Sequence, residues 1–115
     1  MNDLACDVFS RLDEVCGPDD DLRRELTLTF IETGNEDMSR LRDAAAAANV
    51  ADLVTLVHLL RGACATMGAC ALAERCAIVE TALREGCSSE SVERPVADIQ
   101  AAWVVLREDL SAALG

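Results

Sequence analysis

The sequence has no lysine and no tyrosine, and its only aromatic residues are one tryptophan and two phenylalanines. It also has no run of β-branched residues that alternates with polar residues over the length of a strand. Strands favour β-branched and aromatic side chains, whereas this chain is rich in alanine and leucine, which are good helix formers. The composition therefore predicts an all-α protein.

Positive charge is scarce, because 21 acidic residues outnumber 10 basic ones and give a net charge of −11. The basic patches that bind nucleic acid or anionic membranes are absent from the sequence. No apolar stretch reaches the roughly 18 residues that cross a bilayer, and the amino terminus is acidic where a signal peptide would be basic. We expect a cytoplasmic protein that binds neither nucleic acid nor membrane.

The six cysteines include no Cys-x-x-Cys pair, and in a reducing compartment we expect them to be free thiols. A metal site built from His58, Cys64, Cys70 and Cys76 is an alternative. Against it, Cys64 would project about 120° from His58 around one helix. We expect Cys64 and Cys76 to be small core residues and expect no metal site.

At 115 residues the chain has the length of one domain, and we expect a single domain over residues 1–115. The apolar periodicity predicts helices over about residues 3–15, 20–48, 51–68, 70–85 and 93–113. Connections of a few residues favour antiparallel neighbours. The predicted fold is an antiparallel four-helix bundle with an additional short helix at the amino terminus.

In the first and fourth predicted helices, the spacing of apolar residues predicts which face points into the bundle. In the first, Asn2 is a candidate cap, and the expected stripe comprises Leu4, Val8, Leu12 and Val15. In the fourth, the expected stripe comprises Leu72, Cys76, Val79 and Leu83. We expect Glu74, Arg75 and Glu80 to lie on the solvated side of that helix.

The second and last predicted helices each allow two interpretations. The apolar phase of the second continues across Gly34 and Asn35, so we favour one long helix over a break at this pair. The last carries a heptad-like seam that could form a coiled-coil dimer. We favour packing inside the bundle, a monomer, and Trp103 as a core anchor, because the other helices have apolar stripes to cover.

The helix predicted over residues 51–68 holds the only histidine, His58. At 100° per residue its large apolar side chains form one stripe: Leu53, Leu56, Val57, Leu60, Cys64 and Met67. His58 lies roughly 160° from the centre of this stripe. We therefore expect the imidazole to point at solvent.

Two residues within about one turn of His58 suit an approaching phosphoryl group. Arg61 places a permanent cation where it can meet a phosphoryl oxygen. Gly62 stands inside the helix, where glycine costs about 1 kcal/mol relative to alanine. Its missing side chain clears the approach to the ring for another protein.

The segment His58-Leu59-Leu60-Arg61-Gly62, followed by a run of small residues up to Gly68-Ala69, resembles the motif of histidine-containing phosphotransfer (HPt) domains. It differs at Arg61, where lysine is usual, at Val57, where alanine is common, and at Ala63 and Cys64, where serine is frequent. The positive charge is kept at Arg61. The long helix before the histidine helix also resembles this family.

This resemblance implies that His58 is the phosphoacceptor of a relay between receiver-domain aspartates, or takes the group from ATP as in the related chemotaxis-kinase domain. Arg61 would give electrostatic support and Gly62 steric clearance. The implied partners are response-regulator receiver domains or a hybrid sensor histidine kinase. We expect no cofactor in this chain itself, because the partner receiver domain would supply the catalytic aspartate and Mg²⁺.

Around the ring we expect a shallow apolar apron for the partner, made of Val54, Leu59, Ala65 and Ala69. We expect no independent catalysis, since the sequence has no Walker loop, kinase loop or paired metal-binding carboxylates near His58. Two other functions stay open at this point. One is a helical adaptor or dimerisation module with an incidental histidine, and the other is a thiol-based metal or redox sensor.

Overall fold

The computed structural model describes residues 3–114, with side chains described from Asp7 onward. Within this range it contains five α-helices, one short 3₁₀-helix and no strand. The helices are α1 (Asp3–Cys16), α2 (Asp20–Ala46), α3 (Val50–Thr66), α4 (Cys70–Arg84), η1 (Glu90–Val92) and α5 (Glu93–Leu114). The predicted all-α fold class is confirmed.

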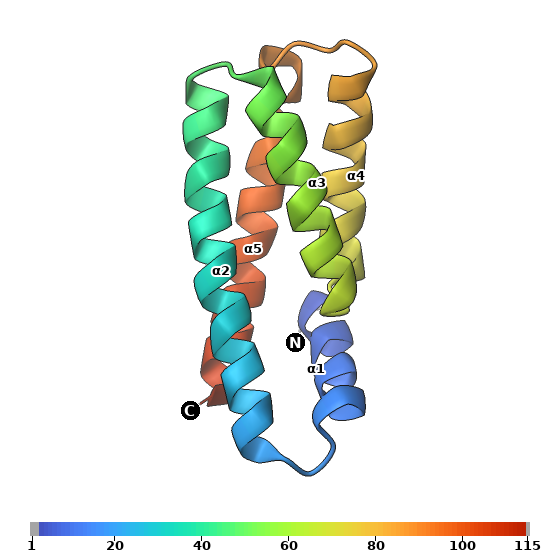
Figure 1. Ribbon diagram of the computed structural model, residues 1–115, viewed down its shortest axis with the longest axis vertical. Helices are drawn as coiled ribbons and strands as arrows, with labels where there is room; N and C mark the ends of the chain where they lie inside the picture. Colours follow the sequence, from blue (N-terminus) through green and yellow to red (C-terminus); the bar gives the residue numbers. More distant parts are fainter. Residues whose placement is uncertain (1–2, 115) are drawn as a thin grey trace.

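Helices α2, α3, α4 and α5 form an antiparallel bundle, and the whole structure, with α1, extends over 46 × 22 × 20 Å (Figure 1). The contact between α3 and α4 is the most extensive, and α2 and α5 close the bundle on the other side. Helix α1 lies beneath the turn between α3 and α4, where it packs against α2, α4 and α5 (Figure 1). Helices α2 and α5 extend beyond the turn between α3 and α4, and α1 packs against this part of the bundle.

The observed helix ends lie within two residues of the predicted ones. Helix α2 ends at Ala46 rather than Ala48 because Ala48 has a φ of +54°, and the Asn49 N–H donates to the Ala44 carbonyl oxygen at 3.0 Å. Gly68 follows α3 in the same way, with a φ of +83°. A residue in the left-handed region cannot continue a right-handed helix. Ala48 therefore ends α2, and Gly68 ends α3.

The expected inner stripe of α1 is partly wrong. Val8 and Leu12 are buried as predicted, but Val15 is exposed and Cys16 takes the inner position. Residues 8, 12 and 16 follow a spacing of four, which keeps them on the side of α1 that faces the bundle. The expected cap at Asn2 and the side chain of Leu4 lie outside the described part of the chain.

Helix α2 continues through Gly34 and Asn35 because this pair is the contact with Trp103 of α5. The indole ring is buried against Gly34 and meets Phe30 edge-on, with 5.4 Å between ring centroids. The indole Nε1–H donates to Asn35 Oδ1 at 3.0 Å. The predictions of one long helix and of Trp103 as a core anchor are therefore confirmed.

The seam of α5 faces the inside of the bundle. Its buried residues are Val96, Ile99, Ala102, Trp103, Leu106 and Leu110, and they join a core to which every helix contributes. The apolar seam of α5 thus packs against the other helices of the same chain, as predicted. None of the helices over residues 3–114 is both long and apolar enough to cross a membrane.

Gly34 and Gly62 should respond oppositely to alanine. A Cβ at Gly34 would lie 2.8 Å from Trp103 Cζ3 and closer still to Cη2 and Cζ2, whereas a Cβ at Gly62 meets nothing within 4 Å. We expect Gly34→Ala to lower the free energy of unfolding by about 1–3 kcal/mol, as overpacking does. Gly62→Ala should raise it by about 0.5–1 kcal/mol because alanine has the higher helix propensity. Urea unfolding of both variants measures this, and a shift of equal sign would contradict the packing of Trp103 on Gly34.

Candidate functional site

His58 lies in the middle of α3, and 60% of its side chain is exposed. The opposite face of the helix is buried in the core through Leu53, Val57, Leu60 and Cys64. The predicted exposure of the imidazole is therefore confirmed. Helix α3 holds the ring at the surface by burying the other side of the same turns.

The ring is not free to rotate, because Glu80 of α4 holds one of its nitrogens. His58 Nδ1 lies 3.0 Å from Glu80 Oε2, and only 7% of the Glu80 side chain is exposed. The expectation that Glu80 lies on the solvated side of α4 is wrong. Residue 80 lies beside the inner stripe of α4, on the edge that packs against α3, so the neighbouring helix covers its side chain.

Two arginines complete the surroundings of Glu80. Arg84 Nε donates to Glu80 Oε2 at 2.9 Å from the next turn of α4, and an Arg61 terminal nitrogen donates to Glu80 Oε1 at 3.5 Å from α3. Both arginine side chains are more than half exposed. A single buried carboxylate thus fixes His58 and two cations at one place on the α3–α4 surface.

The ionised state of Glu80 follows from these contacts. Burial acts to raise its pKa, but hydrogen bonds from Arg84 and His58 outweigh burial and hold the pKa below its usual value. The stabilisation from this network is therefore present above about pH 4.3, the usual carboxyl pKa, and is lost as the pH falls through the lower pKa of the folded protein. At neutral pH Glu80 is an acceptor only.

An acceptor at Nδ1 selects the tautomer of the ring. Since the Glu80 carboxylate has no proton to donate, Nδ1 carries the proton and donates it to Oε2. Nε2 then keeps the lone pair of the neutral imidazole. The His58 ring is therefore held in a fixed orientation, with its side chain 60% exposed and with Nε2 as the nitrogen that Glu80 does not contact.

The other predicted site residues occupy different environments. Arg61 lies at the site, and Gly62 leaves open space one turn beyond His58. Leu59 is 63% exposed, Ala65 is exposed and Val54 is half-buried, so these three are available to a partner. Ala69 is not, because it is fully buried and its N–H donates to the Cys64 carbonyl oxygen at 2.8 Å in the turn before α4. The prediction that Ala69 belongs to the apolar apron is wrong, because α3 ends at Thr66 and Ala69 lies in the turn after it.

Four of the cysteines whose side chains the structure describes lie in two kinds of environment. Cys64 and Cys76 are buried, and desolvation raises the pKa of each thiol to about 12, which makes them poor nucleophiles and poor metal ligands. Cys70 and Cys87 are exposed. Among the side chains that the structure describes, from Asp7 to Leu114, no three His, Cys, Asp or Glu side chains are grouped so that they could hold a metal ion.

The family model of the Hpt domain matches residues 25–114, which include the whole of α3 and α4. The chain belongs to the Hpt domain family. Hpt domains act in histidine phosphotransfer within two-component systems, and the chain has this general role. A comparison with curated proteins found no match.

Two solved structures share the fold of this Hpt domain. One is the HPT domain of a sensor hybrid histidine kinase from Shewanella, which is 17% identical, with a TM-score of 0.80 over 97% of this chain and 96% of that one. The other is histidine-containing phosphotransfer protein B from Pseudomonas aeruginosa, 24% identical, with a TM-score of 0.77 over 93% and 90% of the two chains. Both similarities cover a larger share of the chain than the family model does.

Reasoning from the sequence missed Glu80 and Arg84 as site residues. The one signal for them is their spacing of four on one helix, which is typical of a glutamate–arginine pair. Such pairs are common on exposed helix faces, so this spacing alone predicts a surface ion pair. The rotation of α4 against α3 turns the pair toward His58, and that rotation depends on the packing of the whole bundle.

Proposed function

We propose that this Hpt domain is a phosphorelay intermediate. It accepts a phosphoryl group on His58 Nε2 from the aspartate of a receiver domain or from a hybrid kinase, and passes it to the aspartate of another response regulator. The observation that carries this proposal is the pairing of His58 Nδ1 with the buried Glu80 carboxylate, while 60% of the His58 side chain is exposed.

The transfer requires one bond to form and one to break. The lone pair of Nε2 attacks the phosphorus of the partner's phosphoaspartate, the P–O bond to that aspartate breaks, and the aspartate leaves as a carboxylate. Nδ1 keeps its proton, so the phosphorylated ring carries a positive charge that lies next to the ionised Glu80. The reverse sequence on a second receiver domain returns the neutral ring.

Arg61 and Arg84 supply charge for this step. The transferred phosphoryl group spreads negative charge over its equatorial oxygens, and catalysis consists mainly of positioning and electrostatic stabilisation. Two guanidinium groups and one carboxylate leave a net positive charge beside the ring, although the chain as a whole carries −11. The partner receiver domain would provide Mg²⁺ and the in-line aspartate.

The surface around His58 suits a transient complex. Gly62 leaves space beside the ring, and Leu59 and Ala65 expose apolar groups on the same helix. An interface that must release its partner after transfer needs only a modest apolar area with a charged rim. We expect Leu59 to pack against the receiver domain while Arg61 faces its active site.

A transfer assay tests the proposal directly. The purified domain is incubated with receiver domains that carry ³²P-phosphoaspartate, and the proteins are separated by electrophoresis. We expect label to move to this chain as phosphate that is stable in base and labile in acid, as a phosphoramidate bond is. Absence of label from every donor would favour the alternative of a non-catalytic helical adaptor.

A further inference from the structure

The side of the bundle opposite His58 is formed by α2 and α5, and two adjoining hollows run along it. One has a volume of about 480 Å³ and lies at the η1 end, and the other has a volume of about 290 Å³ and lies further along the two helices. Arg42 and Gln100 line both hollows, which therefore form one groove. Since His58 and Glu80 lie on α3 and α4, the groove is on the other side of the bundle from them (Figure 1).

Helix α5 presents a second seam to this groove, separate from its buried one. The members recur at spacings of four and three and so share one face of the helix: Glu93, Ala97, Gln100, Val104 and Arg107. All five line the groove, and none of them is buried. The buried seam packs inside the chain, whereas this outer seam stays accessible to another molecule.

The lining of the groove is neutral, although the whole chain carries −11. Its charged residues are two arginines and two glutamates, namely Arg42, Arg107, Glu90 and Glu93. Arg107 Nη1 donates to the uncharged amide oxygen of Asn35 at 3.1 Å. Arg42 Nη2 donates to the uncharged hydroxyl of Ser39 at 3.3 Å. Because a guanidinium has five N–H donors, these contacts leave donors on both arginines for a carboxylate.

The charges of the outer seam change sign about its middle. Glu93 lies seven residues before Gln100 and Arg107 lies seven residues after it, so each is about 10 Å from Gln100 along the helix. A two-fold axis that crosses α5 at Gln100, at right angles to the helix, places Glu93 of one copy opposite Arg107 of a second copy. The same axis repeats this pair at the other end. The seam is therefore self-complementary in an antiparallel register.

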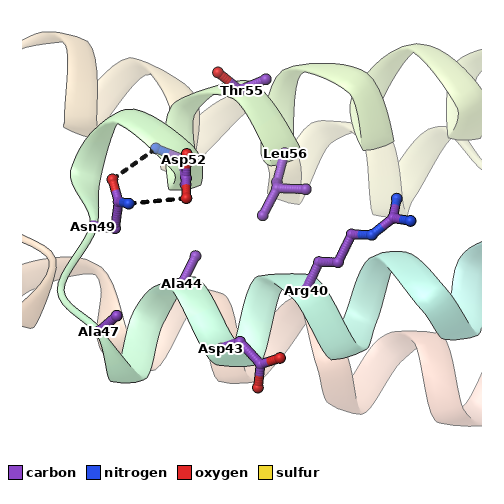
Figure 2. A pocket seen from close by; sticks show the side chains of 8 residues that line it. All are labelled: Arg40, Asp43, Ala44, Ala47, Asn49, Asp52, Thr55 and Leu56. Carbon is purple, nitrogen blue, oxygen red and sulfur yellow. Dashed lines mark hydrogen bonds between the residues drawn. The ribbon is translucent and has the colours of Figure 1, made fainter.

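The hollow on the other side of α2, between α2 and α3, does not have this property. Figure 2 shows its side chains, and Asn49 and Asp52 are bonded to each other there, with 2.8 Å between Asn49 Nδ2 and Asp52 Oδ2. Its charged residues are Arg40, Asp43 and Asp52, which leave a net negative charge. A second chain of net charge −11 is repelled at such a surface, whereas the groove between α2 and α5 is neutral.

We propose that the groove between α2 and α5 is the interface of an antiparallel homodimer, in which Glu93 of each copy pairs with Arg107 of the other. Val104 of one copy then packs beside Ala97 of the other, whose small side chain lets the two α5 helices approach. A face about 33 Å long, the length of α5, and about 20 Å wide buries roughly 1,300 Å² over the two copies. This area is at the low end for specific interfaces, so the dimer exchanges with the monomer.

The dimer leaves both copies of His58 exposed, because the ring lies on the side formed by α3 and α4. Two partners can therefore reach the two rings at once. This inference does not rest on the proposed relay function. It replaces the expectation of a monomer, which considered the inner seam of α5 alone.

Charge reversal combined with sedimentation equilibrium tests the interface, and Arg75 provides a matched control. Arg75 is an exposed arginine of α4, so Arg75→Glu makes the same change in net charge as Arg107→Glu, but away from the groove. The mass of the wild type should rise from 12.3 kDa toward twice that value between about 1 and 300 µM, the range in which small interfaces associate. We expect Arg107→Glu and Glu93→Arg each to weaken the dimer at least about tenfold, because like charges then face each other at both ends. Arg75→Glu should change its dissociation constant by no more than about twofold, since salt screens distant surface charges.

A mixture of the two single variants is the most specific test. When Arg107→Glu pairs with Glu93→Arg, opposite charges again face each other at both ends, so the mixture should associate as tightly as the wild type does. Circular dichroism checks that each variant is folded, and Val104→Asp, at an exposed position of the same seam, should weaken the dimer even if a reversal unfolds the chain. A wild type that stays monomeric over the whole range would overturn the proposal. So would equal dissociation constants for Arg107→Glu and Arg75→Glu, for Val104→Asp and the wild type, or for the mixture and its folded components.

Discussion

Glutamine in place of His58 is expected to abolish phosphoryl acceptance, with less than about 1% of the wild-type label remaining in the transfer assay. Glutamine keeps a similar length and polarity on an exposed helix position, and its amide can still donate to Glu80 Oε2. It has no nitrogen lone pair that can attack phosphorus, because the amide nitrogen is conjugated with its carbonyl. Loss of the label would therefore result from the missing nucleophile and not from a change in the fold.

Two control measurements test whether the variant still folds and still binds its partner. Circular dichroism and urea unfolding should show that His58→Gln folds as the wild type does, with a change in unfolding free energy within about 0.5 kcal/mol, as is usual for exposed positions. A competition assay should show that the variant still binds receiver domains. Label on His58→Gln at the wild-type level would place the phosphoryl group on another residue and refute the proposed role of His58.

Removal of the Glu80 carboxylate should have the second largest effect. We expect Glu80→Ala to slow phosphoryl acceptance about 10–100-fold, by analogy with the loss of a group that orients a metal-binding imidazole. The variant frees the His58 ring to rotate and to populate the other tautomer, in which Nε2 carries the proton and cannot attack. It also releases Arg61 and Arg84 from their shared partner.

Glu80→Gln separates the hydrogen bond from the charge. The amide oxygen can still accept the Nδ1 proton, but it no longer neutralises the positive charge of the phosphorylated ring. We expect a rate between those of the wild type and Glu80→Ala, and a phosphohistidine that decays faster than in the wild type. A purely structural role for Glu80 would instead change the urea midpoint and leave the rate per folded molecule unchanged in both variants.

The sequence predicted the parts of this site that depend on one helix. The exposure of His58 follows from the angular distance between residue 58 and the apolar residues of α3, and no neighbouring helix alters that. The helix ends could also be predicted to within two residues, since Gly17-Pro18, Gly68 and Pro95 limit where helices continue.

The parts that depend on two helices could not be predicted. Glu80 and Arg84 have the spacing of an ordinary surface pair, and only the rotation of α4 against α3 brings them to His58. Gly34 and Asn35 have the composition of a helix terminus, and only the position of Trp103 shows why a glycine is kept inside α2. In both cases the local pattern is ambiguous, and the packing between helices decides its meaning.

The most direct test of the proposed relay chemistry is nuclear magnetic resonance of a sample labelled with ¹⁵N-histidine. His58 is the only histidine of the sequence, so both ring nitrogen signals belong to it without further assignment. Before phosphorylation we expect the shifts of a neutral ring with its proton on Nδ1, and after phosphorylation a ³¹P coupling to Nε2. A proton on Nε2 in the free protein, or a phosphorus coupling to Nδ1, would contradict the proposal that Glu80 holds one nitrogen so that the other can carry the phosphoryl group.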